Sequence, residues 1–290
     1  MWYYITMNTE IQNELKKLYK LTGIRLNIEN EDEVEISDLK KLASAYKEKY
    51  SASNLLFNIL SGVYPYREQL NAIKALHIKP NTKIRLYLIY VPTKVDDNIA
   101  KIITSLYPGK NSEYLCMTDD CHLCFLYLGD DNISDPLLDV IETEGMTGAY
   151  IAFSDIFSDP VKLPKEYYKL KQALIISLIF YSDKKIISPA GLGMGELIYN
   201  IPRPVCEKFL KNYVGESIDE ESMQLANTFL RHNLSIAETS RYMHMHRNTL
   251  VYRLEQIEKK YGLDIKSFEG ASIFNIAILI TNFLKVKNNE

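Results

Sequence analysis

The sequence predicts an α+β protein with a helical N-terminal segment, a central α/β sandwich and an all-helical C-terminal domain. Apolar residues recur at three- and four-residue spacing up to about position 80, which is typical of amphipathic helices. Strand and helix patterns then alternate up to about position 190, and helical patterns alone follow. We therefore divide the chain into segments 1–80, 81–190 and 191–290.

The composition is that of a globular protein without a membrane span. Hydrophobic residues make up 47% and charged residues 24% of the 290 residues, which excludes wholesale disorder. Lys and Arg number 34 against 37 Asp and Glu, so any nucleic-acid contact must come from a local basic patch. The longest apolar runs, Ala173–Tyr181 and Ile273–Ile280, fall short of the ~20 residues that span a bilayer. No secretory signal is recognisable at the start, and we expect a cytoplasmic protein.

In the N-terminal segment, apolar spacing predicts helices at Ile11–Leu18, Leu39–Tyr46 and Leu55–Leu60. Acidic side chains crowd between the first two of these, at positions 29–38. A solvated acidic loop accounts for them, and a docking surface for a basic partner is the alternative.

The middle segment begins with a β-branched, apolar run that predicts a buried strand at Lys83–Val91. The elements expected after it are a helix at Asp96–Tyr107, strands at Glu113–Met117 and Cys121–Leu128, a helix at Pro136–Glu144, a strand at Gly148–Ser154, a helix at Leu163–Phe180 and a strand at Lys185–Ser188. This alternation predicts a mixed sheet covered by helices. Gly191, Gly193 and Gly195 come next, but no strand follows them, so linker glycines are a better account than a dinucleotide site.

Three of the four cysteines form the pattern C-x4-C-x2-C, which formally resembles the spacing of a plant-type ferredoxin. These are Cys116, Cys121 and Cys124, with Cys206 much later. They fall in two apolar strands joined by a turn at Thr118-Asp119-Asp120. We expect reduced, buried thiols rather than a metal or a cofactor, with a cluster, or a metal on Asp119 and Asp120, as the alternative.

The stretch Ser235–Gly262 carries the functional signal. Ser235 and Glu238 have the S-x-x-E spacing of a capping box, which predicts a helix from Ile236 to near Met243 with the small Ser240 at a close helix crossing. After a tight connection at His244 and Met245, a second helix is predicted from Arg247 to Tyr261, with His246 as N-cap and Gly262 at its end. With a preceding helix at Glu220–Arg231, this arrangement is a helix-turn-helix.

The second helix has an apolar face and a face suited to nucleic acid. Leu250, Leu254 and Ile257 recur at helical spacing and are expected in the core. The other side carries side chains that can contact phosphates and base edges in a major groove: Arg247, Asn248, Thr249, Tyr252, Arg253 and Gln256. Positions 231–260 hold six Lys or Arg and three Glu, so this stretch is basic within an acidic chain.

This stretch resembles the C-terminal signature of the PucR/CdaR (sugar diacid regulator) family of bacterial transcriptional regulators, over about residues 205–285. The matching positions are Glu238, Thr239, Arg241, His244, His246, Arg247, Asn248, Thr249, Leu250, Tyr252, Arg253, Leu254, Ile257, Glu258, Gly262 and Asp264. Met245, Ser240 and Gln256 depart from the family pattern, and Gln256 removes one phosphate contact.

The middle segment resembles the degenerate, cyclase-like (GGDEF-like) domain of the same family. Where an active diguanylate cyclase carries its glycine–glycine–acidic signature, this chain has Thr118-Asp119-Asp120-Cys121-His122. Without those glycines a nucleotide cannot approach the backbone, and we expect no enzyme activity.

Together these observations predict a cytoplasmic transcriptional regulator that binds duplex DNA, with Arg247–Tyr261 in the major groove and His246 capping that helix and contacting the DNA backbone. A single module buries too little surface for genomic specificity, so we expect a homodimer, and leave open a small-molecule effector. The tail helix Ser272–Leu284 either packs under the motif or forms a dimer seam, and packing is favoured. The alternatives are a protein-interaction scaffold with a vestigial DNA-binding domain and a cyclase-related, nucleotide-binding enzyme.

Overall fold

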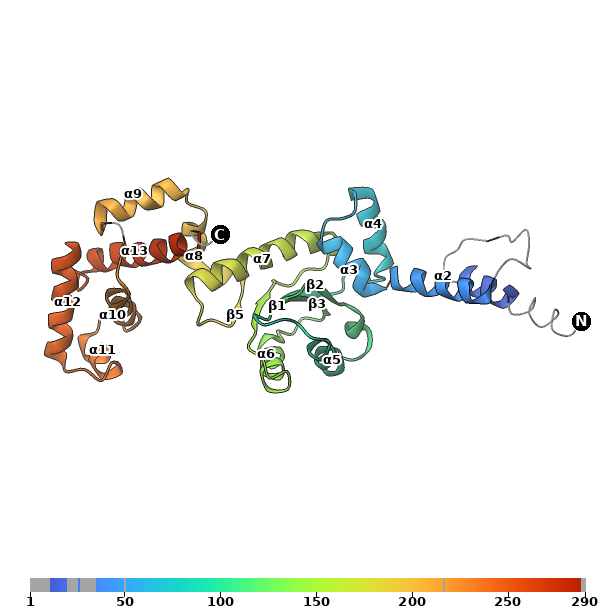
Figure 1. The fold of residues 1–290 in the computed structure, drawn as a ribbon, viewed down its shortest axis with the longest axis horizontal. Coiled ribbons are helices and arrows are strands. Elements are labelled where there is room, and N and C mark those ends of the chain that lie inside the picture. Colours follow the sequence, from blue (N-terminus) through green and yellow to red (C-terminus); the bar gives the residue numbers. More distant parts are fainter. Residues whose placement is uncertain (1–10, 20–25, 27–34, 50, 216, 288–290) are drawn as a thin grey trace, which may run out of the picture. The chain divides into compact units, whose positions relative to one another are not determined.

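The computed structural model describes residues 11–19, 26, 35–49, 51–215 and 217–287 (Figure 1). The chain forms two compact units, Met1–Lys171 and Gln172–Glu290, and their boundary lies inside helix α7 (Leu163–Phe180). The predicted α+β class is confirmed, because a five-stranded sheet lies in the middle of the chain and a purely helical region follows it.

The N-terminal segment is helical over most of its described part. A helix at residues 11–19 packs on α2 (Ile36–Lys49) through the buried Ile11, Leu18 and Leu39. Two further helices follow, α3 (Ala52–Leu60) and α4 (Tyr66–Ala75). The sequence did not predict α4, since only two of its ten residues are buried and its apolar spacing is weak. Most of the acidic stretch at positions 29–38 lies outside the described residues.

The sheet is built around β1 (Ile84–Tyr90), which pairs antiparallel with β3 (His122–Leu128) and β4 (Tyr150–Phe153). β2 (Leu115–Asp119) pairs antiparallel with β3. The strand order is β2-β3-β1-β4-β5, where β5 is Ile186–Ile187. All five strands therefore fall within strands that the sequence predicted, or overlap them within two residues.

Helices α5 (Asp97–Leu106) and α6 (Ser134–Thr143) lie on one face of the sheet (Figure 1). Ile99 of α5 and Leu137 of α6 join Tyr87 of β1 in one buried cluster. Short 3-10 turns connect the regular elements, at Gly109–Glu113, Pro160–Lys162 and Pro189–Gly191.

The β2–β3 hairpin turns at residues 120–121, later than predicted. The sequence placed the turn at Thr118-Asp119-Asp120, whereas β2 extends to Asp119 and β3 begins at His122. The Asp119 carboxylate fixes this turn, because it accepts a hydrogen bond from the Cys121 N–H at 2.9 Å and lies 2.7 Å from Nδ1 of His122. Burial alone would raise the pKa of Asp119, but the hydrogen bonds from His122 and Cys121 outweigh it and lower that pKa.

All four cysteines are free thiols. Cys116 and Cys124 are buried and lie directly opposite each other on β2 and β3; Cys206 is also buried, and Cys121 is half-buried at the turn. Burial raises the pKa of the Cys124 thiol well above its ordinary value, and the neighbouring Cys116 adds to this. Within the described ranges, no three His, Cys, Asp or Glu side chains are grouped closely enough to hold a metal ion.

The C-terminal unit contains six consecutive helices after the 3-10 turn at Pro189–Gly191. They are α8 (Gly193–Tyr199), α9 (Arg203–Tyr213), α10 (Glu220–Arg231), α11 (Ile236–Tyr242), α12 (Arg247–Tyr261) and α13 (Phe268–Lys287). One core joins them, with Cys206, Phe229, Leu254 and Phe274 among its fully buried side chains.

The tail helix α13 packs against α8, α9 and α10, as the sequence favoured. Its stretch Phe268–Val286 has 19 residues and a mean hydropathy of 1.3, so by length and composition alone it could cross a membrane. Half of this stretch is buried within the C-terminal unit, and a helix in the core of a globular protein has the same length, composition and burial. From the sequence we did not expect an apolar stretch of this length, because Asn275 and Thr281 interrupt the apolar run. Neither residue breaks the helix.

The glycines after residue 190 do more than form a linker, because they also allow close packing. Gly193 has a positive φ of 48°, and Gly195 lies so near the rings of Phe180 and Tyr181 that a Cβ atom there would be 2.9–3.0 Å from them. The Tyr181 hydroxyl accepts a hydrogen bond from the Gly195 N–H at 3.0 Å and donates one to the Leu192 carbonyl at 2.8 Å. These contacts fix the start of α8.

Candidate nucleic-acid interface

Helix α10 is anchored at its N-terminus by Asp219. The Asp219 carboxylate accepts hydrogen bonds from the Ser222 N–H at 2.9 Å and from the Ser222 hydroxyl at 2.7 Å. The same carboxylate also binds the far end of α12, because it accepts hydrogen bonds from Lys260 Nζ at 2.8 Å and from the Tyr261 hydroxyl. One side chain therefore caps α10 and holds α12 against it.

The protonation of Asp219 follows from these contacts. Burial alone would raise the pKa of Asp219, but hydrogen bonds from Lys260, Tyr261 and Ser222 together outweigh burial. They hold that pKa well below its usual range. The carboxylate is thus charged wherever the protein is folded near neutral pH.

Helix α11 begins at Ser235, as predicted. The Ser235 hydroxyl oxygen accepts a hydrogen bond from the Glu238 N–H at 3.3 Å. The other half of the predicted capping box is replaced, since the Ser235 N–H donates to the His232 carbonyl at 3.0 Å. On this helix the fully buried small residue is Thr239, whereas the neighbouring Ser240 is half-buried.

The connection between α11 and α12 is a tight left-handed turn. His244 has φ of 51°, which places it in the left-handed region that favours glycine. The Met245 N–H donates to the Ser240 carbonyl at 2.9 Å, and the Met243 N–H donates to the Thr239 carbonyl at 2.9 Å. These bonds close α11 with only four residues, 243–246, between the two helices.

Helix α12 has the ends that the sequence predicted. Nδ1 of His246 accepts a hydrogen bond from the Asn248 N–H at 3.3 Å, so His246 is the N-cap. Gly262 ends the helix in the left-handed conformation, with φ of 71°, and its N–H donates to the Glu258 carbonyl at 2.8 Å.

The two faces of α12 separate as expected. Leu250, Leu254 and Ile257 are buried in the core of the C-terminal unit. The six predicted contact residues are all exposed, as is Gln256 on the same helix: His246, Arg247, Asn248, Thr249, Tyr252 and Arg253. Figure 1 shows α10, α11 and α13 on one side of α12, so the opposite side is not covered by another described element of this unit. The structure therefore brings the predicted residues together on one open helix face.

The charge available on this face differs between its arginines. Arg253 pairs with Glu221 of α10 at 3.5 Å, and both side chains are exposed. Arg241 and Arg247 form no ion pair with any other residue in the described part of the chain. Their guanidinium groups are free to bind phosphate or a base edge, whereas Arg253 must first give up a weak surface pair.

Sequence reasoning missed three parts of this surface. Asp219 was not recognised as a cap, although an Asp directly before a predicted helix is a known start signal. Tyr242, which is 66% exposed and packs against His232 in a tilted arrangement with ring centroids 4.8 Å apart, was overlooked. The pairing of Glu221 with Arg253 could not be found, because it depends on how α10 crosses α12.

Comparisons with known proteins agree with this geometry. Residues 223–280 match the PucR C-terminal helix-turn-helix domain. Two Bacillus subtilis (strain 168) proteins, both named as uncharacterized, are similar to the chain: YsfB is 29% identical over 117 residues, and YxkF is 34% identical over 53 residues. These stretches cover 40% and 18% of this chain, but only 31% and 18% of the relatives, so the chain spans less than a third of either.

Among solved structures, a regulator of polyketide synthase expression from Bifidobacterium adolescentis is similar at a TM-score of 0.35 and 14% identity, covering 80% of this chain and 92% of that one. The match over residues 223–280 includes most of α10, all of α11 and α12, and most of α13. This part of the chain is a PucR-type helix-turn-helix domain.

Proposed function

We propose that this protein is a bacterial transcriptional regulator that binds duplex DNA, with the first turn of α12 in the major groove. The observation that carries the proposal is the exposed helix tip of Arg247, Asn248 and Thr249, which sits above a buried apolar face. A helix N-terminus with a free guanidinium attracts phosphate, and Arg and Asn side chains can each bind a base edge through two hydrogen bonds.

The remaining contacts follow the same face of the helix. Tyr252 and Arg253 lie one turn further along α12, where they meet the sugar-phosphate backbone beside the groove. His246 caps the helix with Nδ1, which leaves Nε2 available to donate to a phosphate.

We infer that the protein acts as a homodimer in the cytoplasm. One helix-turn-helix buries too little DNA surface for specific recognition in a genome, and a two-fold pair of such helices reads two half-sites about one helical turn apart. We further propose the domain division 1–80, 81–190 and 191–290, with a GGDEF-like middle domain that has no cyclase activity. The hairpin supports the last point, because Asp119 is used inside the turn.

The test is the affinity of the full chain for a duplex selected from genomic fragments of the host, measured by fluorescence polarisation over a range of salt concentrations. Affinity should fall steeply as salt rises. Arg247→Ala should weaken specific binding by about 1–3 kcal/mol if Arg247 binds a base, or lower the salt slope by about one if it binds phosphate.

Arg203→Ala is the matched control, since Arg203 is an exposed arginine on α9 of the same unit. It should leave both the affinity and the slope unchanged. Equal affinity of wild type and Arg247→Ala at every salt concentration would contradict the proposed contact. Absence of salt-dependent binding by the wild type would favour the protein-interaction scaffold instead.

A further inference from the structure

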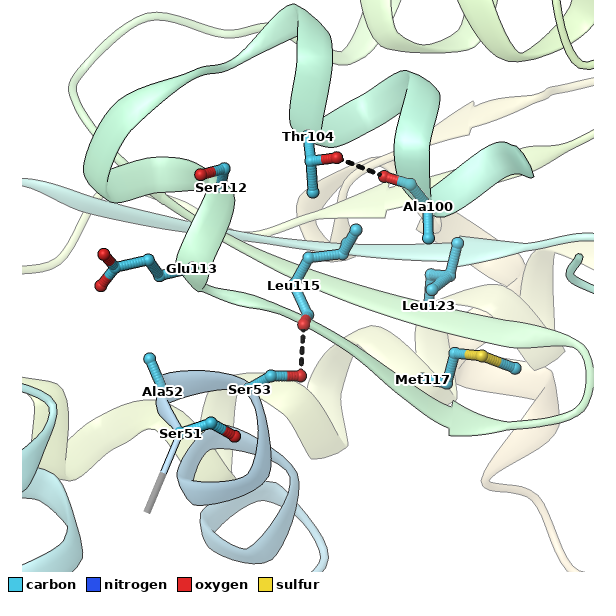
Figure 2. Close-up of a pocket in the computed structure, with 10 residues that line it drawn as sticks. All are labelled: Ser51, Ala52, Ser53, Ala100, Thr104, Ser112, Glu113, Leu115, Met117 and Leu123. Carbon is cyan, nitrogen blue, oxygen red and sulfur yellow. Dashed lines mark hydrogen bonds between the residues drawn. The ribbon is translucent and has the colours of Figure 1, made fainter. Parts of the chain in front are cut away.

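The N-terminal unit contains a cavity of about 620 Å³ between the sheet and two of its helices (Figure 2). It is bounded by the start of α3, one side of α5, the 3-10 turn at Gly109–Glu113 and the strands β2 and β3. This volume lies within the range of small-molecule sites, about 300–1,000 Å³. Neither the helix-turn-helix nor the proposed DNA contacts use it.

Half of the described residues that line the cavity are apolar. They are Leu115 and Met117 of β2, Leu123 of β3, Ala52 of α3 and Ala100 of α5. Figure 2 shows Met117 and Leu123 together at one end of the cavity. Leu115 lies between them and Glu113, which is at the other end. A ligand that fills this space therefore needs a compact apolar body.

The hydroxyl groups that line the cavity mostly present acceptors. Ser53 donates its proton to the Leu115 carbonyl at 2.6 Å, Thr104 donates to the Ala100 carbonyl at 3.0 Å, and Ser112 donates to the Gly109 carbonyl at 2.7 Å. A hydroxyl whose proton is engaged can offer only its oxygen lone pairs to a ligand. Ser51 is the exception among the described lining residues, because it accepts from the Asn54 N–H and keeps its own proton.

The charge of the cavity is negative. Among the described residues that line it, Glu113 is the one charged side chain. Figure 2 shows its carboxylate at the edge of the cavity, on the side of Ser112 and Ala52 and away from Met117. No ion pair neutralises this carboxylate within the described part of the chain. The cavity thus combines an apolar body, hydroxyl acceptors and an anion at one end.

We propose that this cavity binds a small primary amine, with the ammonium group at Glu113 and the apolar part on β2 and β3. An ammonium group carries three donors and no acceptor, which matches the hydroxyl oxygens and the carboxylate. A carboxylate ligand of the same shape would meet Glu113 as a like charge and find few donors. The inference goes beyond the proposed DNA binding and does not depend on it.

The test uses phenethylamine, tyramine and cadaverine as probes on the full chain. Binding is followed through the ¹³C-labelled methyl group of Met117, assigned with the variant Met117→Leu. Probes of this size should bind in about the millimolar range. Phenethylamine should shift the Met117 resonance saturably, whereas 3-phenylpropionate, which carries a carboxylate on a similar body, should not.

Two variants locate the site. Glu113→Gln removes the charge with little change of shape and should weaken phenethylamine binding about three- to fivefold, as expected for one ion pair at an exposed carboxylate. Ala100→Leu fills the cavity and should weaken phenethylamine binding at least about tenfold. Glu68→Gln on α4 is the matched control and should bind as the wild type does.

The proposal is overturned if none of the three amines shifts the Met117 resonance at about 10 mM, several times the expected dissociation constant. It is also overturned if 3-phenylpropionate binds as tightly as phenethylamine, or if both variants bind like the wild type. Because no DNA is present, these results are independent of whether the protein is a transcriptional regulator.

Discussion

Replacing Asp219 with alanine should loosen the helix-turn-helix without touching its exposed face. Asp219 lies at the start of α10, and its carboxylate accepts hydrogen bonds from Ser222, Lys260 and Tyr261. Asp219→Ala therefore removes the cap of α10 and the link to the C-terminal end of α12 in one step.

The magnitude follows from the separate contacts. Loss of an N-cap bond costs about 1 kcal/mol, and loss of the part-buried bond from the Tyr261 hydroxyl costs about another 1 kcal/mol. The Lys260 pair adds only about 0.5 kcal/mol, because both side chains are more than a third exposed. Tyr261 keeps one partner, since its hydroxyl also accepts from the Asp219 N–H at 3.1 Å. The total is about 2–3 kcal/mol.

Hydrogen exchange on the full chain, read by mass spectrometry, measures this loss of local stability in peptides from α10 and α12. A loss of about 2–3 kcal/mol should speed exchange of their slowest amides roughly 30- to 150-fold. Asp183→Ala is the control: it removes only the exposed pair with Arg231, 3.3 Å apart, and should change exchange less than about threefold.

The effect should depend on pH in a defined direction. The folded-state pKa of Asp219 is lowered, so its stabilising contribution is complete above the unfolded pKa of about 4 and is lost as pH falls through the folded value. The difference in local stability between wild type and Asp219→Ala should therefore persist at pH 7 and at pH 5. It should become smaller only in stronger acid. If Asp219→Ala exchanges no faster than the control at pH 7, the reasoning about this anchor is wrong.

Three further substitutions test local features by thermal unfolding of the full chain. Thr239→Val should raise stability by about 1 kcal/mol, because the buried Thr239 hydroxyl has no hydrogen-bond partner among the described residues; a loss would mean that the hydroxyl has one. His244→Gly should stabilise by about 0.5–1 kcal/mol by relieving the left-handed backbone, and an unchanged melting temperature for both His244→Gly and His244→Val would contradict that strain. Gly195→Ala should destabilise by about 1–3 kcal/mol, since a Cβ there meets the Tyr181 ring; full tolerance would show that α8 packs less tightly.

Much of the fold could be predicted because local signals were strong. Helices α7 and α10 have the bounds that were predicted for them, Leu163–Phe180 and Glu220–Arg231. The cap at Ser235 and the terminal Gly262 were predicted because capping chemistry depends on a few neighbouring residues.

Features that depend on distant contacts could not be predicted. Helix α4 buries only Ala72 and Ile73, so its pattern is too weak to detect without its neighbours. The role of Gly195 depends on Tyr181, which lies directly after the end of α7, and the cavity beside Glu113 is formed by residues from α3, α5 and two strands. For the candidate interface, the exposed face of α12 was predicted residue by residue, but the Asp219 anchor was not.

Methylation interference on a selected duplex tests the central claim most directly. Methyl groups at guanine N7 lie in the major groove, and those at adenine N3 lie in the minor groove. If the tip of α12 enters the major groove, N7 methylation within two half-sites should abolish binding, and Arg247→Ala should remove interference at one guanine in each. Interference confined to adenine N3, or absent from both grooves, would contradict this account.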